Sequence, residues 1–403
     1  MSSVTEQLIN YPIVEEHGLD IDPLYAELQQ HGPVKVRLPF GEPCWLATRY
    51  HDVRMVYSDQ RFGKELGLSH DIPRVREITA SDPSLLANMD PPRHTRMRKL
   101  TSAAFARPRI RALAGWIEGL VAGLLDDMEQ REQPADFFSC VAWTLPNLVV
   151  TGVLGVATDD VPRFRAWIDR MLATNSAVEA RADAHASLRA YILELVAARR
   201  RQVTDDVLSD LVQARDEQDQ FTEDELVMLC LSLFLGGFET TVAQLGSTLY
   251  VLLAQRELWE ELLEDRAVRP AALEELWRWI PSTRYGMPLV RWAIEDVELS
   301  DGVVIAAGDP ILPERAVANR DESVFPRAGT VDFHRDDPPA HLSLGFGAHH
   351  CVGASLAQLE IEVTLGQMLA RFPNVELALA PHDVRWSRAS FMRSVEALPI
   401  KWR

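Results

Sequence analysis

Residues 341–360 read His-Leu-Ser-Leu-Gly-Phe-Gly-Ala-His-His-Cys-Val-Gly-Ala-Ser-Leu-Ala-Gln-Leu-Glu, and no other stretch of the chain is as informative. It contains three glycines, which let a backbone pass close to a bulky group, at Gly345, Gly347 and Gly353. Phe346 adds a flat apolar side chain. Cys351 directly precedes a helical pattern expected over about 352–372, and the N-terminus of a helix favours thiolate over thiol. We therefore expect a thiolate that binds a metal or acts as a nucleophile.

Four interpretations of Cys351 are open from the residues alone. A buried, inert cysteine would not need three glycines around it. A zinc site with His341, His349 or His350 would normally bring a second pair of ligands, such as CxxC, and the chain has none. A cysteine nucleophile with a histidine base is a third option. Axial ligation of haem iron needs only one thiolate, and glycines with an aromatic side chain suit a porphyrin face, so this interpretation is favoured.

Composition narrows the class of protein. The chain has 403 residues, and its 41 Lys+Arg against 59 Asp+Glu give a net charge of −18. This acidity argues against a nucleic-acid partner, which requires a basic face. The four cysteines are scattered without a disulfide framework, and the first ten residues lack the order of a signal peptide. We expect a soluble, cytoplasmic protein with no membrane partner.

Helical periodicity dominates the chain between about residues 91 and 255. Two short regions differ: 34–48 alternates around a Gly-Glu-Pro turn, and 289–313 alternates around Ser300-Asp-Gly302, so each predicts a β-hairpin. Thr222 and Glu225 form a capping box that opens a long apolar helix reaching about Gln255. The expected architecture is one mainly α domain with a small β-rich region.

The middle of that long helix reads Gly236-Gly-Phe-Glu-Thr-Thr241. Two glycines inside a helix cost about 1 kcal/mol each, so a compensating close approach is expected there. Glu239 is costly to bury without a partner. Thr240 either bonds back to the carbonyl of Gly236 in a tight helix crossing, or faces a cavity as part of a proton relay.

Residues 346–353 match FGxHxCxG, the haem-binding signature of the cytochrome P450 family, and the resemblance extends over roughly residues 20–403. Glu275 and Arg278 resemble the family's ExxR pair, which is structural and joins an arginine of a later meander, here Arg335. Phe238 stands where many relatives have histidine, and Pro313-Glu-Arg315 replaces a usually apolar strand.

The resemblance implies the family's fold, a mainly α, prism-shaped single domain over 1–403, in which 1–20 is expected to be poorly ordered. It implies haem b with Cys351 as the axial ligand of the iron. Glu239 and Thr240 match the oxygen-activation motif and are the expected catalytic residues. The residues expected to contact haem by this resemblance are His94, Arg98, Gly236, Arg291, Phe346, His349, Cys351 and Gly353.

The implied reaction is a monooxygenase reaction that uses O2 and hydroxylates or epoxidises a largely hydrophobic small molecule of secondary metabolism. Electrons are expected from a ferredoxin and an NAD(P)H-dependent ferredoxin reductase, docking near Arg96, Lys99 and Arg107. Oxidative coupling of aromatic or indole groups is the alternative reaction, and a non-catalytic haem sensor a remote one. The expected substrate contacts are Leu86, Ala87, Ser232, Leu235, Met287, Pro288, Leu289, Phe391 and Met392.

Overall fold

A computed structural model of the chain describes residues 8–12, 18–75, 82–172, 178–218, 222–284, 290–387 and 392–402. These residues form two compact units. Unit 1 takes its residues from 1–83, 87–92 and 267–351. Unit 2 takes its residues from 84–86, 93–266 and 352–403. The expectation of a single haem domain over 1–403 stays a prediction.

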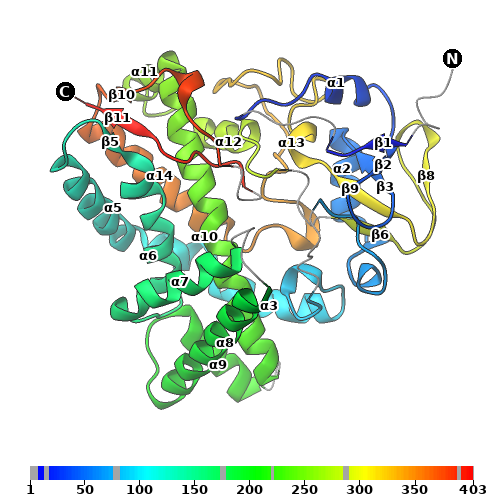
Figure 1. Cartoon of the computed structure of the whole chain (residues 1–403), viewed down its shortest axis with the longest axis horizontal. Coiled ribbons are helices and arrows are strands. Elements are labelled where there is room, and N and C mark those ends of the chain that lie inside the picture. The colour runs from blue at the N-terminus through cyan, green and yellow to red at the C-terminus, as the bar shows by residue number, and fades with distance from the viewer. Residues whose placement is uncertain are drawn as a thin grey trace. The chain divides into compact units, whose positions relative to one another are not determined.

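Unit 1 is built on a six-stranded mixed sheet (Figure 1). Its strands, in spatial order, are β1 (Ile9–Asn10), β2 (Val34–Arg37), β3 (Cys44–Ala47), β9 (Pro310–Pro313), β6 (Arg291–Ala293) and β4 (Phe62–Gly63). The helices of the unit are α1 (Leu24–Leu28), α2 (Tyr50–Ser58), α12 (Arg269–Trp279) and α13 (Arg315–Ala318). A separate two-stranded sheet pairs β7 (Val297–Glu298) with β8 (Val304–Ile305).

Both predicted hairpins are present in unit 1. In the first, β2 pairs antiparallel with β3, and Val34 and Val36 are buried while Lys35 and Arg37 are exposed. This alternation is the period of a strand with one face on the core. In the second, β7 and β8 are joined through Ser300-Asp-Gly302. The alternation of side chains along each segment was therefore sufficient to locate these turns.

Part of the N-terminal segment, residues 8–12 and 18–20, is described, while 1–7 and 13–17 lie outside the described residues, so the expectation of poor order over 1–20 stays a prediction. Residues 8–12 include β1, which pairs in parallel with β2. Tyr11 is buried and its hydroxyl donates a hydrogen bond to Oε2 of Glu314 at 2.7 Å. The carboxylate of Glu314, flagged as unusual in the sequence, is thus a buried anchor for the first strand.

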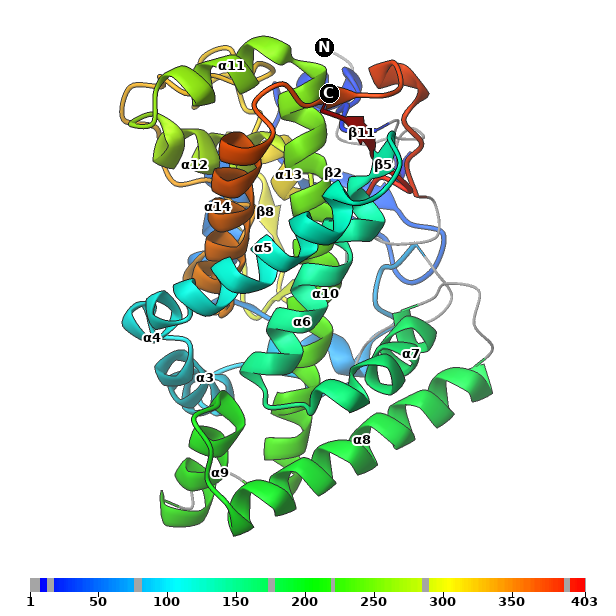
Figure 2. The same cartoon turned by 90° about the vertical axis from the view of Figure 1, so that its left-hand side faces the viewer.

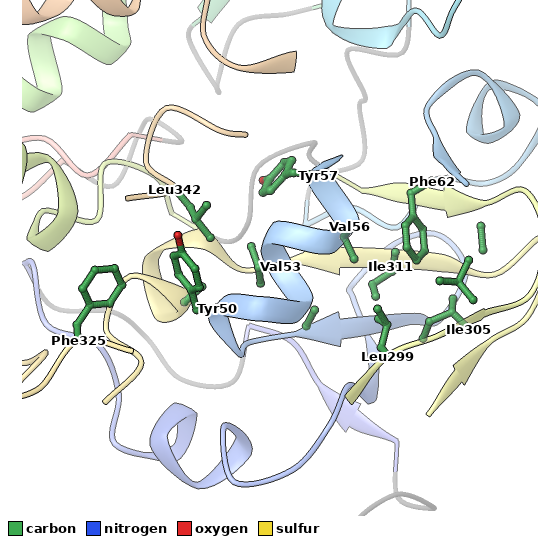
Figure 3. Close-up of a cluster of buried hydrophobic side chains, with 14 of the residues drawn as sticks. Tyr50, Val53, Val56, Tyr57, Phe62, Leu299, Ile305, Ile311, Phe325 and Leu342 are labelled. Atoms are coloured by element: carbon green, nitrogen blue, oxygen red, sulfur yellow. The ribbon is translucent and has the colours of Figure 1, made fainter. Parts of the chain in front are cut away.

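The core of unit 1 lies between α2 and the sheet (Figure 3). Tyr50, Val53 and Val56 of α2 are buried there, and the ring of Tyr50 meets that of Phe325 edge-on with centroids 5.5 Å apart. The N-terminus of α2 is held by Asp321, whose Oδ2 accepts a hydrogen bond from the backbone N–H of Tyr50 at 2.9 Å. Burial of these rings holds the helix against the sheet.

A buried charge cluster holds the C-terminal part of unit 1 together. Arg278 donates two hydrogen bonds of 2.7 Å to the carboxylate of Glu275, and Arg335 donates one of 2.9 Å. The other N–H groups of Arg278 bind the backbone carbonyls of Asn319, Ala328 and Thr330. The structure therefore brings together the three residues expected to form the family's structural cluster.

Unit 2 is mostly helical, and Figures 1 and 2 show α10 running through it. Its helices are α3 (Arg93–Ala104), α4 (Arg107–Ala112), α5 (Ala114–Glu129), α6 (Thr144–Val153), α7 (Val161–Leu172), α8 (Val178–Arg201), α9 (Val207–Gln218), α10 (Glu223–Ala254), α11 (Arg256–Glu264) and α14 (Ala354–Arg371). A small sheet adds β5 (Ala135–Asp136), β10 (Glu376–Leu377) and β11 (Pro399–Lys401).

α10 is the central helix of unit 2. The predicted capping box is present, because the side chain of Thr222 accepts from the N–H of Glu225 and the carboxylate of Glu225 accepts from the N–H of Thr222. α10 is long and apolar enough to cross a membrane by length and composition, but 67% of its most apolar window is buried inside the protein. α6, α8 and α14 pack against it (Figure 2).

Glu360 lies on α14 and is buried, with a side-chain oxygen, Oε2, that has no hydrogen-bond partner among the described residues. Burial raises the pKa of this carboxyl well above its usual range, because the charged form loses its hydration. The folded protein therefore keeps the Glu360 proton at pH values where the unfolded chain has lost it.

We expect Glu360→Gln to stabilise the protein relative to the wild type increasingly as the pH rises from 5 to 8. Folding takes up a proton at Glu360, so the wild type loses stability as the pH rises above the unfolded-state pKa of about 4.3, at most about 1.4 kcal/mol per pH unit. Urea unfolding at several pH values measures the difference. Glu362→Gln, an exposed position on the same helix, is the control. Parallel pH curves for Glu360→Gln and the wild type would contradict the expectation.

Candidate functional site

The Cys351 loop is closed by hydrogen bonds of its own backbone. The N–H of Gly345 donates to the carbonyl of Leu342 at 2.9 Å, that of His350 to Gly347 at 3.1 Å, and that of Cys351 to Leu344 at 2.8 Å. A backbone tied in this way presents the Cys351 side chain from one fixed position.

Gly347 is required by both conformation and space. Its φ of +67° lies in the left-handed region, and a Cβ at this position would stand 2.7 Å from the carbonyl oxygen of Tyr57, at the end of α2. Phe346 turns to the same helix, where the guanidinium of Arg54 lies 4.8 Å from its ring centroid. Within unit 1, Phe346 is half-buried against the α2 core, and its part as a wall for haem stays a prediction.

The segment that leads into the loop is held by hydrogen bonds to two helices, α12 and α13. The side-chain oxygen of Asn319 accepts from the N–H of Leu342 at 2.7 Å, and its Nδ2 donates to Oγ of Ser343 at 2.8 Å. Ser343 in turn donates to the carbonyl of Trp277 on α12 at 2.6 Å. Arg315 donates to the carbonyl of Ser343 at 2.9 Å. Ser343 is therefore a junction between α12, α13 and the loop.

Cys351 differs from the other three cysteines in exposure. Cys44, Cys140 and Cys230 are buried, whereas Cys351 is exposed. Burial raises the pKa of Cys44 and Cys230 to about 12, which makes thiolate chemistry unfavourable at these positions. Cys351 is thus the cysteine that an external ligand can reach.

Arg291 on β6 is a buried cation that forms no ion pair with a carboxylate of the described residues. It is 3% exposed, and its Nη1 has no hydrogen-bond partner in the described part of the chain. Burial lowers its pKa, because the guanidinium loses water without gaining an ion pair. The guanidinium carbon lies 5.7 Å from the ring centroid of Tyr57, whose own hydroxyl is buried and unpartnered within the described residues.

Further positive charge surrounds Arg291. Arg315 lies close enough for its charge to disfavour the charged forms of both Arg291 and Lys64. Burial, together with the charge of Arg291, lowers the pKa of Lys64 well below its usual range. The neighbouring acids are already engaged: Asp90 accepts from the backbone N–H of Lys64 at 2.7 Å, and Glu314 accepts from Tyr11. The cluster fits an external anion that supplies the missing negative charge.

In unit 2, one stripe in the middle of α10 is incompletely buried. The parts of the helix before and after it, residues 226–231 and 241–249, are buried. The stripe follows helical spacing, three and four residues apart, and consists of Ser232, Leu235, Gly236, Glu239 and Thr240. Gly236 and Thr240 are its exposed members. A Cβ at Gly236 would have no atom within 4 Å, whereas one at Gly237 would stand 3.0 Å from Cγ2 of Val150 on α6. One glycine makes room for helix packing and the other borders open space.

Thr240 and Phe238 have distinct surroundings on α10. The hydroxyl of Thr240 donates to the carbonyl of Gly236 at 2.9 Å, which is the internal bond that the sequence left as one option. α10 is uninterrupted through this motif. Phe238 is buried and its ring meets that of Trp143 with centroids 4.8 Å apart, so it packs against unit 2 rather than along the stripe.

Comparison with known proteins gives a consistent result. Residues 173–383 match the family model for cytochrome P450. The chain is 40% identical to the mycinamicin IV hydroxylase/epoxidase of Micromonospora griseorubida, covering 97% of this chain and 98% of that protein. It is also 40% identical to the nocardicin C N-oxygenase of Nocardia uniformis subsp. tsuyamanensis, over 98% of each chain. A solved cytochrome P450 with biaryl coupling reactivity matches with a TM-score of 0.92 and 37% identity, over 98% of this chain and 100% of that one.

The chain belongs to the cytochrome P450 family. Its mainly α fold with a small β-rich region is thereby confirmed as the P450 fold, and its activity as that of a P450 monooxygenase. Members of this family carry a haem-iron cofactor, and bacterial P450s take electrons from redox partners and use O2 with small-molecule substrates.

The residues of this P450 fit such a cofactor. An exposed cysteine in a closed loop suits the iron, and a buried, unpaired arginine in the same unit suits a haem carboxylate. Among the described residues, no group of three or more His, Cys, Asp and Glu side chains is placed to hold a metal ion.

The remaining predicted haem contacts lie on several elements. His94 is buried on α3, and Arg98, one turn later, donates to Oγ of Ser102 at 3.1 Å. His349 belongs to the Cys351 loop, and Gly353 immediately precedes α14. Their contacts with haem stay predictions. Sequence reasoning missed Tyr57 and Lys64, which accompany Arg291, and no sequence signal marks them.

The predicted substrate residues are only partly described. Leu86 and Met392 are buried, Ala87 is exposed, and Ser232 and Leu235 are half-buried on the α10 stripe. Met287, Pro288, Leu289 and Phe391 lie outside the described residues. Their roles toward substrate stay predictions.

The docking patch expected near Arg96, Lys99 and Arg107 stays a prediction, and the structure shows the surroundings of these residues. Arg96 donates to both oxygens of Glu225, at 3.2 and 2.7 Å, and Arg93 binds the same carboxylate. The carboxylate of Glu225, the capping residue of α10, is thus shared by two arginines of α3 and ties α3 to the start of that helix. Lys99 is exposed, and so is Arg107.

We expect Gly236→Ala to raise the free energy of unfolding of the haem-free protein by about 1 kcal/mol, because alanine favours the helix and the new methyl group meets no neighbour. Gly237→Ala is the matched control and should gain less, since Val150 must move. Urea unfolding measures both changes. Equal gains in the free energy of unfolding at the two positions would contradict the difference between open space at Gly236 and close packing at Gly237.

Proposed function

We propose that this P450 binds haem b through Cys351 and hydroxylates or epoxidises a largely hydrophobic small molecule of secondary metabolism. We further propose that it is a soluble, cytoplasmic enzyme reduced by a ferredoxin and an NAD(P)H-dependent ferredoxin reductase. The observation that carries the proposal is the exposed Cys351 in a hydrogen-bonded loop, in the same unit as the buried cation Arg291, whose Nη1 has no hydrogen-bond partner among the described residues.

The bound haem would supply the activation of O2, for which a thiolate ligand favours O–O cleavage. The chain's own residues bind and orient the group. Arg291 would neutralise a haem carboxylate, and Tyr57 with its unpartnered hydroxyl would donate to it. The Asn319–Ser343 bonds hold the backbone that presents Cys351. Gly236 leaves the α10 face free of a side chain.

Glu239 and Thr240 would handle protons on the α10 stripe. The hydroxyl proton of Thr240 is donated to the carbonyl of Gly236, so its oxygen lone pairs are available to accept a hydrogen bond from water. Glu239 is half-buried and next to it in the chain, where a carboxyl can exchange protons with solvent. Together they would hold a water molecule and deliver its proton along the stripe.

The range of relatives supports a tailoring reaction without fixing the product. Names among them include a mycinamicin IV hydroxylase/epoxidase and a nocardicin C N-oxygenase. A structural relative has biaryl coupling reactivity, which favours oxidative coupling as the second candidate reaction. The mass of the product separates the two: added oxygen indicates oxygenation, whereas a dimer without added oxygen indicates coupling.

The carbon monoxide difference spectrum of the dithionite-reduced protein tests the proposal. We expect the strongly red-shifted Soret band of a thiolate-bound ferrous haem, and we expect Cys351→Ala to abolish it. Cys44→Ala, at a buried cysteine of β3, should keep the band. A protein that binds haem without this band would overturn thiolate ligation and leave the sensor interpretation. A protein that binds no haem would overturn the proposal as a whole.

Thr240→Ala should lower product formation by roughly 10²-fold, the scale on which positioned proton transfer contributes to rate. Thr241→Ala is the matched control: its hydroxyl also bonds back along the helix, to the carbonyl of Gly237 at 3.3 Å, but the side chain is buried away from the open face. The rate of product formation, measured together with NAD(P)H consumption, gives the effect. Similar losses in both variants would indicate a helix defect instead of a lost proton path.

A further inference from the structure

His341 opens the segment that leads to Cys351, and its ring is held from three directions within unit 1. Nε2 lies 3.4 Å from Oε2 of Glu274, and Nδ1 accepts a hydrogen bond from the backbone N–H of Ser343 at 3.3 Å. The ring is nearly parallel to that of Trp277, with an interplanar angle of 15° and a centroid distance of 6.4 Å. Only 8% of the side-chain surface is exposed, so the imidazole has a defined place in the unit.

Two of these contacts come from one face of α12. Glu274 and Trp277 are three residues apart, a spacing that places both side chains on the same side of a helix. The third contact, from Ser343, belongs to the segment that follows His341 itself. The ring therefore lies between α12 and the backbone that it holds.

The bond from Ser343 fixes the protonation state of the ring. A ring nitrogen that accepts a hydrogen bond carries no proton, so the proton of the neutral imidazole is on Nε2, where it faces Glu274. When the ring becomes a cation, Nδ1 turns into a donor and the N–H of Ser343 loses its acceptor. This hydrogen bond is therefore one that acid removes.

The other bonds of Ser343 do not change in mild acid. Its hydroxyl donates to the carbonyl of Trp277 and accepts from Nδ2 of Asn319, and its carbonyl accepts from Arg315. A backbone carbonyl, a carboxamide and a guanidinium keep their charge between pH 5 and 8. Among the described residues, His341 is thus the partner of Ser343 that can switch from acceptor to donor in this range.

Ser343 stands between two carbonyls that close the Cys351 loop. The carbonyl of Leu342 accepts a backbone N–H of the loop at 2.9 Å, and that of Leu344 accepts the N–H of Cys351 at 2.8 Å. A rotation of the backbone at Ser343 would move both acceptors. The orientation of Cys351 therefore depends on whether Nδ1 of His341 can accept.

The charged side chains of α12 and α13, which flank this segment, are Arg269, Glu274, Glu275, Arg278 and Arg315. Arg269 begins α12 at the far end, Glu275 and Arg278 bind each other, and Arg315 binds the carbonyl of Ser343. Glu274 is thus the carboxylate that faces the ring, and its side chain is largely exposed. A carboxylate screened by water attracts a cation only weakly, so it offers the protonated ring little in place of the lost bond.

We propose that His341 is a positioning residue for Cys351: its neutral ring holds the Ser343 backbone in the orientation that presents the thiolate, and protonation of the ring releases it. This inference rests on the proposed ligation of haem iron by Cys351. The thiolate centre would then be lost in mild acid through a group that lies ten residues before the ligand in the sequence.

Two variants separate the acceptor from the ring. His341→Asn keeps an oxygen that can accept the N–H two residues ahead, as asparagine does in turns, but it does not titrate. His341→Phe keeps an aromatic ring against Trp277 but has no acceptor. His334→Asn, at an exposed histidine of the same unit, is the control.

The first measurement is the rate at which the thiolate band of the carbon monoxide difference spectrum decays at pH 8 and at pH 5. We expect the wild type and His334→Asn to decay about 3- to 10-fold faster at pH 5, on the scale of one lost hydrogen bond. His341→Asn should decay at similar rates at both pH values. His341→Phe should already show the faster decay at pH 8.

The second measurement is hydrogen exchange of the backbone amides of residues 342–351 in the purified full chain at pH 8, which needs neither a haem spectrum nor turnover. We expect faster exchange in His341→Phe than in the wild type, and exchange at the wild-type rate in His341→Asn.

Two results would overturn the proposal. One is a decay in His341→Asn that depends on pH as strongly as in the wild type. The other is wild-type decay and wild-type exchange in His341→Phe. A wild type that lacks the thiolate band but shows the expected pattern of exchange would overturn the proposed function alone.

Discussion

The geometry of unit 1 depends on the buried ion pairs that Arg278 and Arg335 form with the carboxylate of Glu275. Arg278 and Arg335 both bind it, and Arg278 uses its remaining donors to gather three backbone carbonyls. One of these belongs to Asn319, whose side chain then binds the backbone of Leu342 and the hydroxyl of Ser343. The Cys351 loop follows directly. A chain of short bonds thus leads from one buried ion pair to the cysteine.

Local patterns in the sequence were reliable where a single element determines the structure. The hairpin at 34–48, the capping box at Thr222 and the long helix were predicted because alternation, capping and helical spacing are encoded within a few residues. The motif around Cys351 was predicted from its resemblance. Its hydrogen-bonded closure and the role of Gly347 against Tyr57 depend on contacts that the sequence does not show.

Predictions were weaker where a side chain acts through a distant partner. Arg96 looked like a solvated surface cation, yet it forms an ion pair with Glu225, 129 residues further along the chain. The charged pair after Pro313 gave no sign of its position, yet Glu314 is buried and fastens the N-terminal strand. The net charge of −18 likewise gives no hint that Arg291 is buried in unit 1 without an ion pair to a carboxylate of the described residues. Such pairings follow from the fold as a whole.

The adjacent glycines of α10 have an implication for altering this enzyme. Gly237 is constrained by Val150 of a neighbouring helix, whereas Gly236 faces open space. Side-chain volume at position 236 can therefore be increased in steps, through alanine and serine, without repacking the helical bundle. Neighbouring positions on a helix point about 100° apart. A side chain at position 236 therefore enters the open space without changing the contact between position 237 and Val150. A library built at this single codon would vary side-chain size on the open face of α10 while the packing of α10 against α6 stays constant.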